Sequence, residues 1–388
     1  MSGEFSRTIG NYSGDRDGWN QKITNQGGDF LQSWQWGEFQ RAIGQQVWRL
    51  DAGGVSVQVL QYSLPWGQNY LYGPHISIRY QESSIKRVVE EVLAVLQGLA
   101  KKHGSIFLRV DFLVEQATAI ATDLQQALRE AKFRPAPSNY YFSAVSQSPF
   151  VAHLDVGQLP DKVLASLRYN TRRSLRLAQE AGVAVKTSDD IQQFFALLKN
   201  MSLRKGFGAH PQGHYFKLQQ AFGDDLVLLL VHKGGCHCEC PEYAEGCVAI
   251  SGSALSQDSR LPRCSSEVGN KNFCSLRARN DKLLSGAMML FYGEQATYLH
   301  AASLPNKENL GAPYMILWQA ILEAKKRGCK VLDLGAIAPA DELSHPWQSI
   351  TTFKMGWRPK PVNYLSAYDW VNKKLWYKLY CGAKNFKF

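Results

Sequence analysis

The sequence contains no apolar run near the roughly 20 residues that a membrane-spanning helix needs. Residues 1–28 are polar and glycine-rich, without the apolar core of a secretory signal. We therefore expect a chain that stays in the cytoplasm.

Several catalytic motifs are also missing. We find no Walker loop, no dinucleotide-binding fingerprint, no Gly-x-Ser-x-Gly elbow and no His-Glu-x-x-His. Acyl-coenzyme A enzymes of the acetyltransferase fold cradle a pyrophosphate on a glycine-rich turn at a helix start. The corresponding turn here offers only Gly311 before Ala312 and Pro313, which argues against coenzyme A.

The chain instead carries a marked excess of positive charge. Its 388 residues have a net charge of +11 and 45% hydrophobic content, which predicts a globular protein of two domains. The charge favours an anionic partner. Nucleic acid, a phosphorylated metabolite and the inner membrane face all fit.

Six of the eight cysteines lie within residues 236–274. The segment that contains them lies between two expected strands that a short turn could join. Residues 236–281 are therefore interpreted as an insertion. Their spacing lacks the paired Cys-x2-Cys of common zinc sites. With His237 among them they still supply enough soft ligands for zinc, so metal binding stays open beside a mobile surface loop or a non-native insertion, which are favoured. We assign no catalytic role there.

Strand and helix patterns alternate along both halves, which predicts an α/β fold. The first half has expected strands at 47–50, 55–64 and 106–111 and helices at 84–101 and 116–131. After a proline-rich link, the second half has expected helices at 160–181, 191–205, 210–222 and 313–326. Its strands are expected at 226–231, 286–292, 296–301 and 331–335, followed by a strand at 363–370 and a closing helix at 371–380.

Three basic or acidic features could carry chemistry. Arg168, Arg172 and Arg176 recur every four residues, so they form either an anion-binding stripe or a solvated helix face. Asp111 ends a strand, where it could act as a base or bind an amine, or be structural. Lys354 is either a fixed cation in a cleft or a surface lysine.

A further polar group surrounds the glycine-broken junction at residues 206–208. Two histidines, a tyrosine and basic side chains occur together there, which favours substrate contact. They are Arg204, Lys205, His210, His214 and Tyr215.

Ordered blocks across nearly the whole chain resemble one family, the FemABX aminoacyltransferases. The blocks are FLQSWQWGEF (30–39), LRVD (108–111), QEAGV (179–183), residues 201–215, YLHAAS (298–303), APY (312–314), DLGAI (333–337) and FKMGW (353–357). The resemblance implies two tandem acetyltransferase-like domains with mixed sheets flanked by helices. Residues 1–148 with 365–388 would form the first domain, and 149–364 the second.

The resemblance also implies transfer of an amino acid from aminoacyl-tRNA to the peptide stem of a peptidoglycan precursor, lipid II or UDP-MurNAc-pentapeptide. No cofactor is needed, because the ester is already activated. Lys354 and Asp111 match catalytic positions. The implied substrate contacts are Gln40, Arg168, Arg172, Arg176, Arg204, His210, Tyr215, Tyr298, His300 and Phe353.

Four positions depart from the family pattern. Gln40 replaces a basic residue, His210 an arginine, and His300 and Ile106 tyrosines. These changes leave the identity of the acceptor open.

Two other functions remain as alternatives. One is an N-acyltransferase that uses a carrier protein or coenzyme A as acyl donor. The other is a non-catalytic protein that binds tRNA or a membrane surface. The tail at 370–378, rich in aromatic residues and lysine, could contact the inner membrane face peripherally or pack as an ordinary helix.

Overall fold

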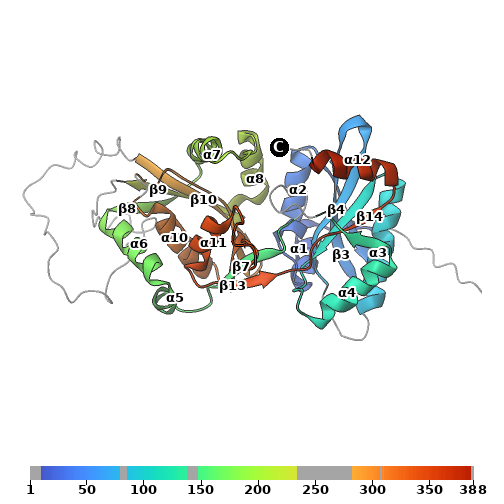
Figure 1. Cartoon of the computed structure of the whole chain (residues 1–388), viewed down its shortest axis with the longest axis horizontal. Helices are drawn as coiled ribbons and strands as arrows, with labels where there is room; N and C mark the ends of the chain where they lie inside the picture. Colours follow the sequence, from blue (N-terminus) through green and yellow to red (C-terminus); the bar gives the residue numbers. More distant parts are fainter. Residues whose placement is uncertain are drawn as a thin grey trace, which may run out of the picture.

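The computed structural model describes residues 10–78, 85–137, 147–233, 282–305, 308 and 310–385. The predicted insertion at 236–281 lies outside these residues. Within them, no helix combines the length and apolarity that a membrane crossing requires. Figure 1 shows two sheets lying side by side along the long axis of the molecule.

The N-terminal sheet is mixed, because β4 and β5 are parallel while its other neighbouring strands are antiparallel. In spatial order its strands are β1 (Gly10–Asn11), β2 (Gln46–Ala52), β3 (Val55–Ser63), β4 (Asn69–Ile76), β5 (Phe107–Phe112), β14 (Tyr368–Val371) and β6 (Phe133–Pro135). The accompanying helices are α1 (Arg16–Asn25), η1 (Phe30–Gln32), α2 (Trp34–Ala42), α3 (Ile85–Lys102), α4 (Ala119–Glu130) and α12 (Lys374–Asn385).

The C-terminal sheet follows the same plan, with β11 and β12 as its parallel pair. In spatial order its strands are β13 (Lys360–Asn363), β7 (Phe150–Asp155), β12 (Val331–Ala336), β11 (Gln295–Ser303), β10 (Lys282–Tyr292), β9 (Leu226–Lys233) and β8 (Val183–Ser188). Its helices include α5 (Pro160–Ser166), α6 (Tyr169–Glu180), α7 (Ile191–Lys205), α8 (Gln212–Phe222), α10 (Ala312–Lys326) and α11 (Gln348–Met355). The predicted tandem α/β architecture is confirmed.

The last segment of the chain returns to the N-terminal sheet, where β14 pairs with β5 and β6. The expected strand at 363–370 is shorter and later in the structure, and the closing helix runs from Lys374 to Asn385. We propose that each sheet is the core of one domain, divided near residue 148, with residues 365–388 completing the first.

The single helix predicted at 160–181 is wrong at its centre. Leu167 and Arg168 have ψ values of 150° and 147°, which separate α5 from α6. The Arg168 N–H donates to the Gly356 carbonyl at 3.1 Å rather than to a carbonyl of α5. Burial of the Leu167 side chain in the core fixes the same turn.

A shared apolar core joins the two sheets. Phe30, Leu31 and Phe39, from η1 and α2, pack with Phe194 of α7 and Leu218 of α8. In Figure 1, α2 lies on the side of the N-terminal sheet that faces α8. The Lys217 Nζ reinforces the junction by donating to the Ala42 carbonyl at 2.9 Å.

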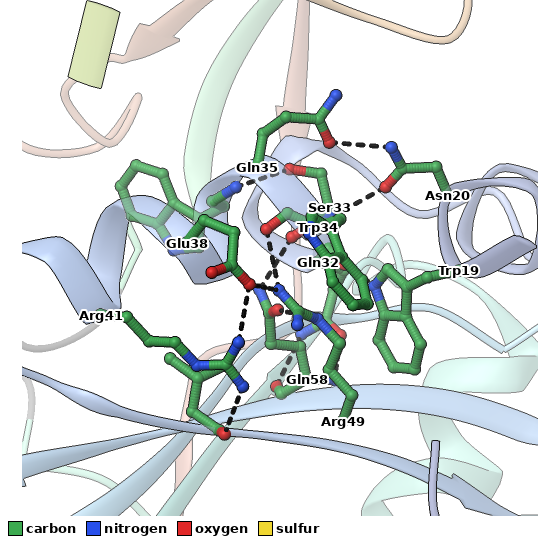
Figure 2. Close-up of polar contacts among 12 residues, drawn as sticks. Trp19, Asn20, Gln32, Ser33, Trp34, Gln35, Glu38, Arg41, Arg49 and Gln58 are labelled. Atoms are coloured by element: carbon green, nitrogen blue, oxygen red, sulfur yellow. Dashed lines mark hydrogen bonds and ion pairs between the residues drawn. The ribbon is translucent and has the colours of Figure 1, made fainter. Parts of the chain in front are cut away.

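The segment that makes this junction is fastened to the N-terminal sheet by buried polar groups (Figure 2). The Arg49 guanidinium on β2 lies 3.6 Å from the centroid of the Trp34 ring. It donates to the Glu38 carboxylate at 2.9 Å and to Gln58 Oε1 at 3.1 Å. Gln58 Nε2 in turn donates to the Ser33 carbonyl, so β2 and β3 hold the start of α2.

We expect Gly37→Ala to destabilise the protein. A Cβ at Gly37 would lie 2.3 Å from Gln58 Oε1 and 2.4 Å from Arg49 Nη2, so it would push α2 away from the sheet. A loss of about 1–3 kcal/mol in the free energy of unfolding is expected, as for overpacked sites. The measurement is urea denaturation followed by circular dichroism.

The matched control is Gly213→Ala on α8, where a Cβ meets no heavy atom within 4 Å. It should be neutral or stabilising, by up to about 1 kcal/mol, since alanine favours helix. Equal stability of the Gly37 and Gly213 variants would contradict the proposed packing constraint.

Candidate functional site

Asp111 lies near the end of β5, in the buried polar junction between the sheets. Its Oδ2 accepts from the Tyr72 hydroxyl at 2.5 Å, and its Oδ1 accepts from the His75 N–H. His75 has a φ of +45°, an uncommon conformation for a residue other than glycine. This irregularity near the end of β4 holds the His75 amide on the carboxylate.

The His75 side chain forms an ion pair with Asp29, which also caps η1. Burial alone would lower the pKa of His75, but the Asp29 carboxylate overrides that effect. With smaller contributions from Asp111 and Asp333, it raises the pKa to about 9. His75 is therefore an imidazolium at neutral pH.

Lys354 approaches the same junction from the C-terminal sheet. Its Nζ donates to the Ala336 carbonyl at 2.6 Å, and no other partner of Nζ is found among the described residues. Burial lowers its pKa to about 8, and the charge of Asp333 opposes part of that shift. Lys354 thus remains mostly protonated at neutral pH, and N–H donors of its ammonium group remain available for a substrate.

Tyr364 connects the two sides. Its ring centroid lies 6.3 Å from that of His75 and 6.1 Å from that of His153. His153 Nε2 is 3.8 Å from Asp333 Oδ1. Burial raises the pKa of Asp333, while His153, the Gly335 amide, His75 and Lys354 all oppose that rise. We call the set Asp29, His75, Asp111, His153, Asp333, Lys354 and Tyr364 the junction cluster.

A second group, the imidazole cluster, consists of His210, His214, Tyr215 and His300. The rings of His210 and His214 stack with centroids 3.9 Å apart, and Tyr215 lies 5.4 Å from His300. Burial lowers the pKa of His214 to about 3 and that of His300 to about 4, and His210 adds to both shifts. These rings are uncharged at neutral pH.

The predicted arginine stripe lies on exposed surface. Arg168 precedes α6, while Arg172 and Arg176 follow on the helix. Arg172 donates to the Ala165 carbonyl, and Arg176 lies 3.5 Å from Glu180. Arg204, on α7, donates to the Ser303 carbonyl.

The remaining predicted residues contribute in different ways. Gln40 is buried on α2, and its Oε1 has no hydrogen-bond partner among the described residues. Tyr298 and Phe353 pack against the core of the C-terminal sheet. The structure therefore brings Lys354 and Asp111 to one junction, and His210, Tyr215 and His300 to another group.

Sequence reasoning did not assign Asp29, His75, His153 or Tyr364 to a site. Asp29 directly precedes the FLQSW block, so a helix-capping signal was present. His75 lies within β4, a strand that the sequence pattern did not predict. Their meeting depends on long-range pairing that spacing alone cannot reveal.

The model of the FemAB family matches residues 17–233 and 257–385. The chain belongs to the FemAB family. The match omits residues 234–256, nearly all of which belong to the predicted insertion at 236–281. Membership confirms the resemblance, and the relatives of this FemAB protein support the prediction of an acyltransferase through their names.

Two relatives illustrate the relationship. "Lipid II:glycine glycyltransferase" of Staphylococcus epidermidis is 20% identical over 382 residues, covering 91% of this chain and 90% of that protein. The protein of the same name from Staphylococcus aureus strain MRSA252 is 20% identical over 389 residues, covering 92% and 91%. A solved structure of FemX matches with a TM-score of 0.75 at 16% identity, covering 96% of this chain and 99% of that chain.

We expect Asp29→Asn to remove the main cause of the raised His75 pKa. Without the carboxylate, burial dominates and the pKa should fall from about 9 towards or below its ordinary value of 6.5. Titration of the imidazole followed by NMR measures this directly.

The same ion pair should make stability depend on pH. A histidine whose pKa is raised on folding contributes stability fully below pH 6.5 and loses it as pH rises through about 9. The free energy of unfolding of the wild type should therefore exceed that of Asp29→Asn most at pH 6, and by less at pH 9.5. A difference that does not vary with pH would contradict the assignment.

Proposed function

We propose that this FemAB protein transfers an amino acid from aminoacyl-tRNA to the peptide-stem amine of a peptidoglycan precursor. The observation that carries the proposal is the buried Lys354 cation at the junction where Asp111 and His75 also lie. The two Staphylococcus relatives, named lipid II:glycine glycyltransferase, support this choice of acceptor.

The arginine face of α6 supports a donor rich in phosphate. Arg168, Arg172, Arg173 and Arg176 are all exposed there. The helix is fastened close to Lys354, because a Cβ at Gly356 would lie 2.3 Å from Thr171 Oγ1. A tRNA held by its phosphates along α6 could therefore present its 3′ ester to the Lys354 ammonium.

The start of α10 argues against coenzyme A as the donor. Gly311, just before the helix, packs so tightly on α6 that a Cβ would lie 2.9 Å from the Ser174 carbonyl. Pro313 also removes one amide donor from the first turn. The helix end that would cradle a pyrophosphate is thus partly covered.

The chemistry requires no cofactor. The acceptor amine attacks the ester carbonyl, a C–N bond forms, and the bond to the tRNA 3′ oxygen breaks. The amine loses a proton and the 3′ oxygen gains one, so the step balances. Lys354 stabilises the tetrahedral oxyanion by charge, and Asp111 holds the amine in line.

The imidazole cluster bears on which precursor is used. Its histidines are uncharged at neutral pH, and Gln40 carries no charge, so these residues supply no cation for the acceptor's phosphates. That arrangement favours lipid II, whose phosphates lie at the membrane surface, over UDP-MurNAc-pentapeptide. Peripheral contact with the inner membrane face belongs to the same proposal.

The main test is transfer itself. Charged tRNAs with labelled amino acids are offered with lipid II or UDP-MurNAc-pentapeptide, and the products are identified by mass. We expect Lys354→Met to lower kcat by about 10²–10³-fold, as for loss of one oxyanion donor. Consumption of acyl-coenzyme A in place of charged tRNA would sink the proposal.

Two controls separate catalysis from folding. The melting temperature of Lys354→Met should equal or exceed that of the wild type, because the variant no longer buries a charge. In the wild type, activity should fall as pH rises through about 8, where the ammonium is lost. Lys354→Arg should move that alkaline limb upward, since arginine stays protonated.

The donor site has its own test. Changing Arg172, Arg173 and Arg176 together to glutamine should raise KM for charged tRNA about tenfold or more. The slope of log KM against log salt should fall by about one for each phosphate that the variant no longer neutralises. Arg87→Gln is the control, because the Arg87 side chain is exposed on α3, and it should change neither value. If the triple variant has the same KM for charged tRNA and the same salt dependence as the wild type, the arginines of α6 do not bind tRNA and only face solvent.

A further inference from the structure

The outer side of α12 exposes large apolar side chains. Leu375 and Leu379 are 71% and 53% exposed, and Trp66, on the turn between β3 and β4, is 79% exposed. Apolar surface of this kind stabilises a protein only when something covers it. No described part of the chain covers these three side chains.

The turn and the helix form one continuous surface. The ring of Trp66 lies 6.0 Å from that of Trp376, and Figure 1 shows the β3–β4 hairpin beside α12. Trp66 has a φ of +58°, so the turn holds its backbone in a conformation that tryptophan seldom adopts. Because Trp66 is 79% exposed and its ring contact with Trp376 covers little of it, this cost points to a role outside the fold.

The spacing along α12 sorts its side chains by type. Tyr377 is buried against the sheet, and the opposite side carries Leu375 and Leu379, four residues apart. Lys374 and Lys378 are exposed on the adjacent stripe. Around the helix, Trp376 is followed by the two leucines and then by the two lysines. An apolar face beside a basic face is typical of a helix that lies in a membrane interface.

The surroundings of this surface are positive. The segments that meet there, residues 64–68, 101–104 and 372–380, contain no aspartate or glutamate. Lys101 Nζ lies 5.6 Å from the Trp370 ring centroid, and Lys373 donates to Gln68. The nearby Asp369 is fully buried, its charge is neutralised by Arg109, and it accepts a hydrogen bond from the Tyr377 hydroxyl.

We propose that Trp66, Leu375 and Leu379, with Lys374 and Lys378, form a docking surface for an anionic lipid bilayer. We call these five residues the α12 face. Leucines gain by entering the acyl boundary, the tryptophan favours the headgroup level, and lysines attract anionic lipid. Leucine offers no ring for bases to stack on, so the surface fits RNA less well.

The α12 face is linked to the junction cluster by packed rings. Phe107 of β5 contacts Tyr380 of α12 at 4.8 Å and stacks on Tyr70 at 4.7 Å, between ring centroids. Tyr62 stacks on Tyr70 at 5.2 Å and approaches Tyr72, whose hydroxyl donates to Asp111. Docking by α12 would hold Asp111 at a fixed height above the bilayer, which suits a lipid-linked acceptor.

The inference rests on the proposed function only in explaining why the protein would bind a membrane. Its first test therefore measures membrane binding without catalysis. The full chain is sedimented with phosphatidylcholine vesicles that contain or lack phosphatidylglycerol. Binding is expected only with the anionic lipid. The triple variant Trp66→Ser, Leu375→Ser, Leu379→Ser should weaken the partition coefficient at least about 100-fold.

The charge contribution is tested separately. Lys374→Gln and Lys378→Gln should each weaken binding about fivefold. Leu159→Ser is the control, because Leu159 is 60% exposed beside α5, at the other end of the molecule in Figure 1. Equal vesicle binding by the wild type and the triple variant would overturn the proposal, as would binding of tRNA in place of vesicles by this surface.

The second test uses transfer kinetics. With lipid II in anionic vesicles the triple variant should lose about tenfold or more in kcat/KM, while transfer to a soluble muramyl peptide stays unchanged. Equal losses with both acceptors would contradict a docking role. If the wild type transfers to neither acceptor, the proposed function fails while the vesicle result still decides the docking surface.

Discussion

The burial of η1 and α2 between the sheets is the constraint on which the site depends. Phe30 and Phe39 pack into the opposite half of the molecule, while Arg49 and Gln58 fasten the same segment to its own sheet. Asp29 stands at the start of this segment and binds His75. The segment formed by η1 and α2 therefore sets both the spacing of the two sheets and the position of the Asp29 carboxylate in the candidate site.

Charge balance at the junction follows from that closeness. The buried Asp29 and Asp111 carboxylates and the half-buried Asp333 carboxylate would repel one another without the neighbouring His75 and Lys354 cations. Each sheet supplies members of both signs. The site therefore exists only when the halves are together. The burial that lowers the pKa of Lys354 and raises that of Asp333 also strengthens the electrostatic interactions among these groups.

Much of the architecture was readable from periodicity. The helix predicted at 313–326, with its proline start and basic end, corresponds to α10, and the strands predicted at 226–231 and 286–292 lie within β9 and β10. The break at Leu167 was not readable, because the Gly356 carbonyl that takes the Arg168 amide is distant in sequence. Lys354 and Asp111 stood out by their neighbours, whereas His75 and Tyr364 gained meaning only from strand pairing across the fold.

The late return of β14 affects the order of events during synthesis. Until residues 368–371 leave the ribosome, β5 lacks the neighbour that separates it from β6, and Arg109 lacks the Asp369 carboxylate that neutralises it. By then Lys354 has already been made. The nascent N-terminal half thus has an open sheet edge at β5, and its sheet is completed only after the segment that contains Lys354 has been made.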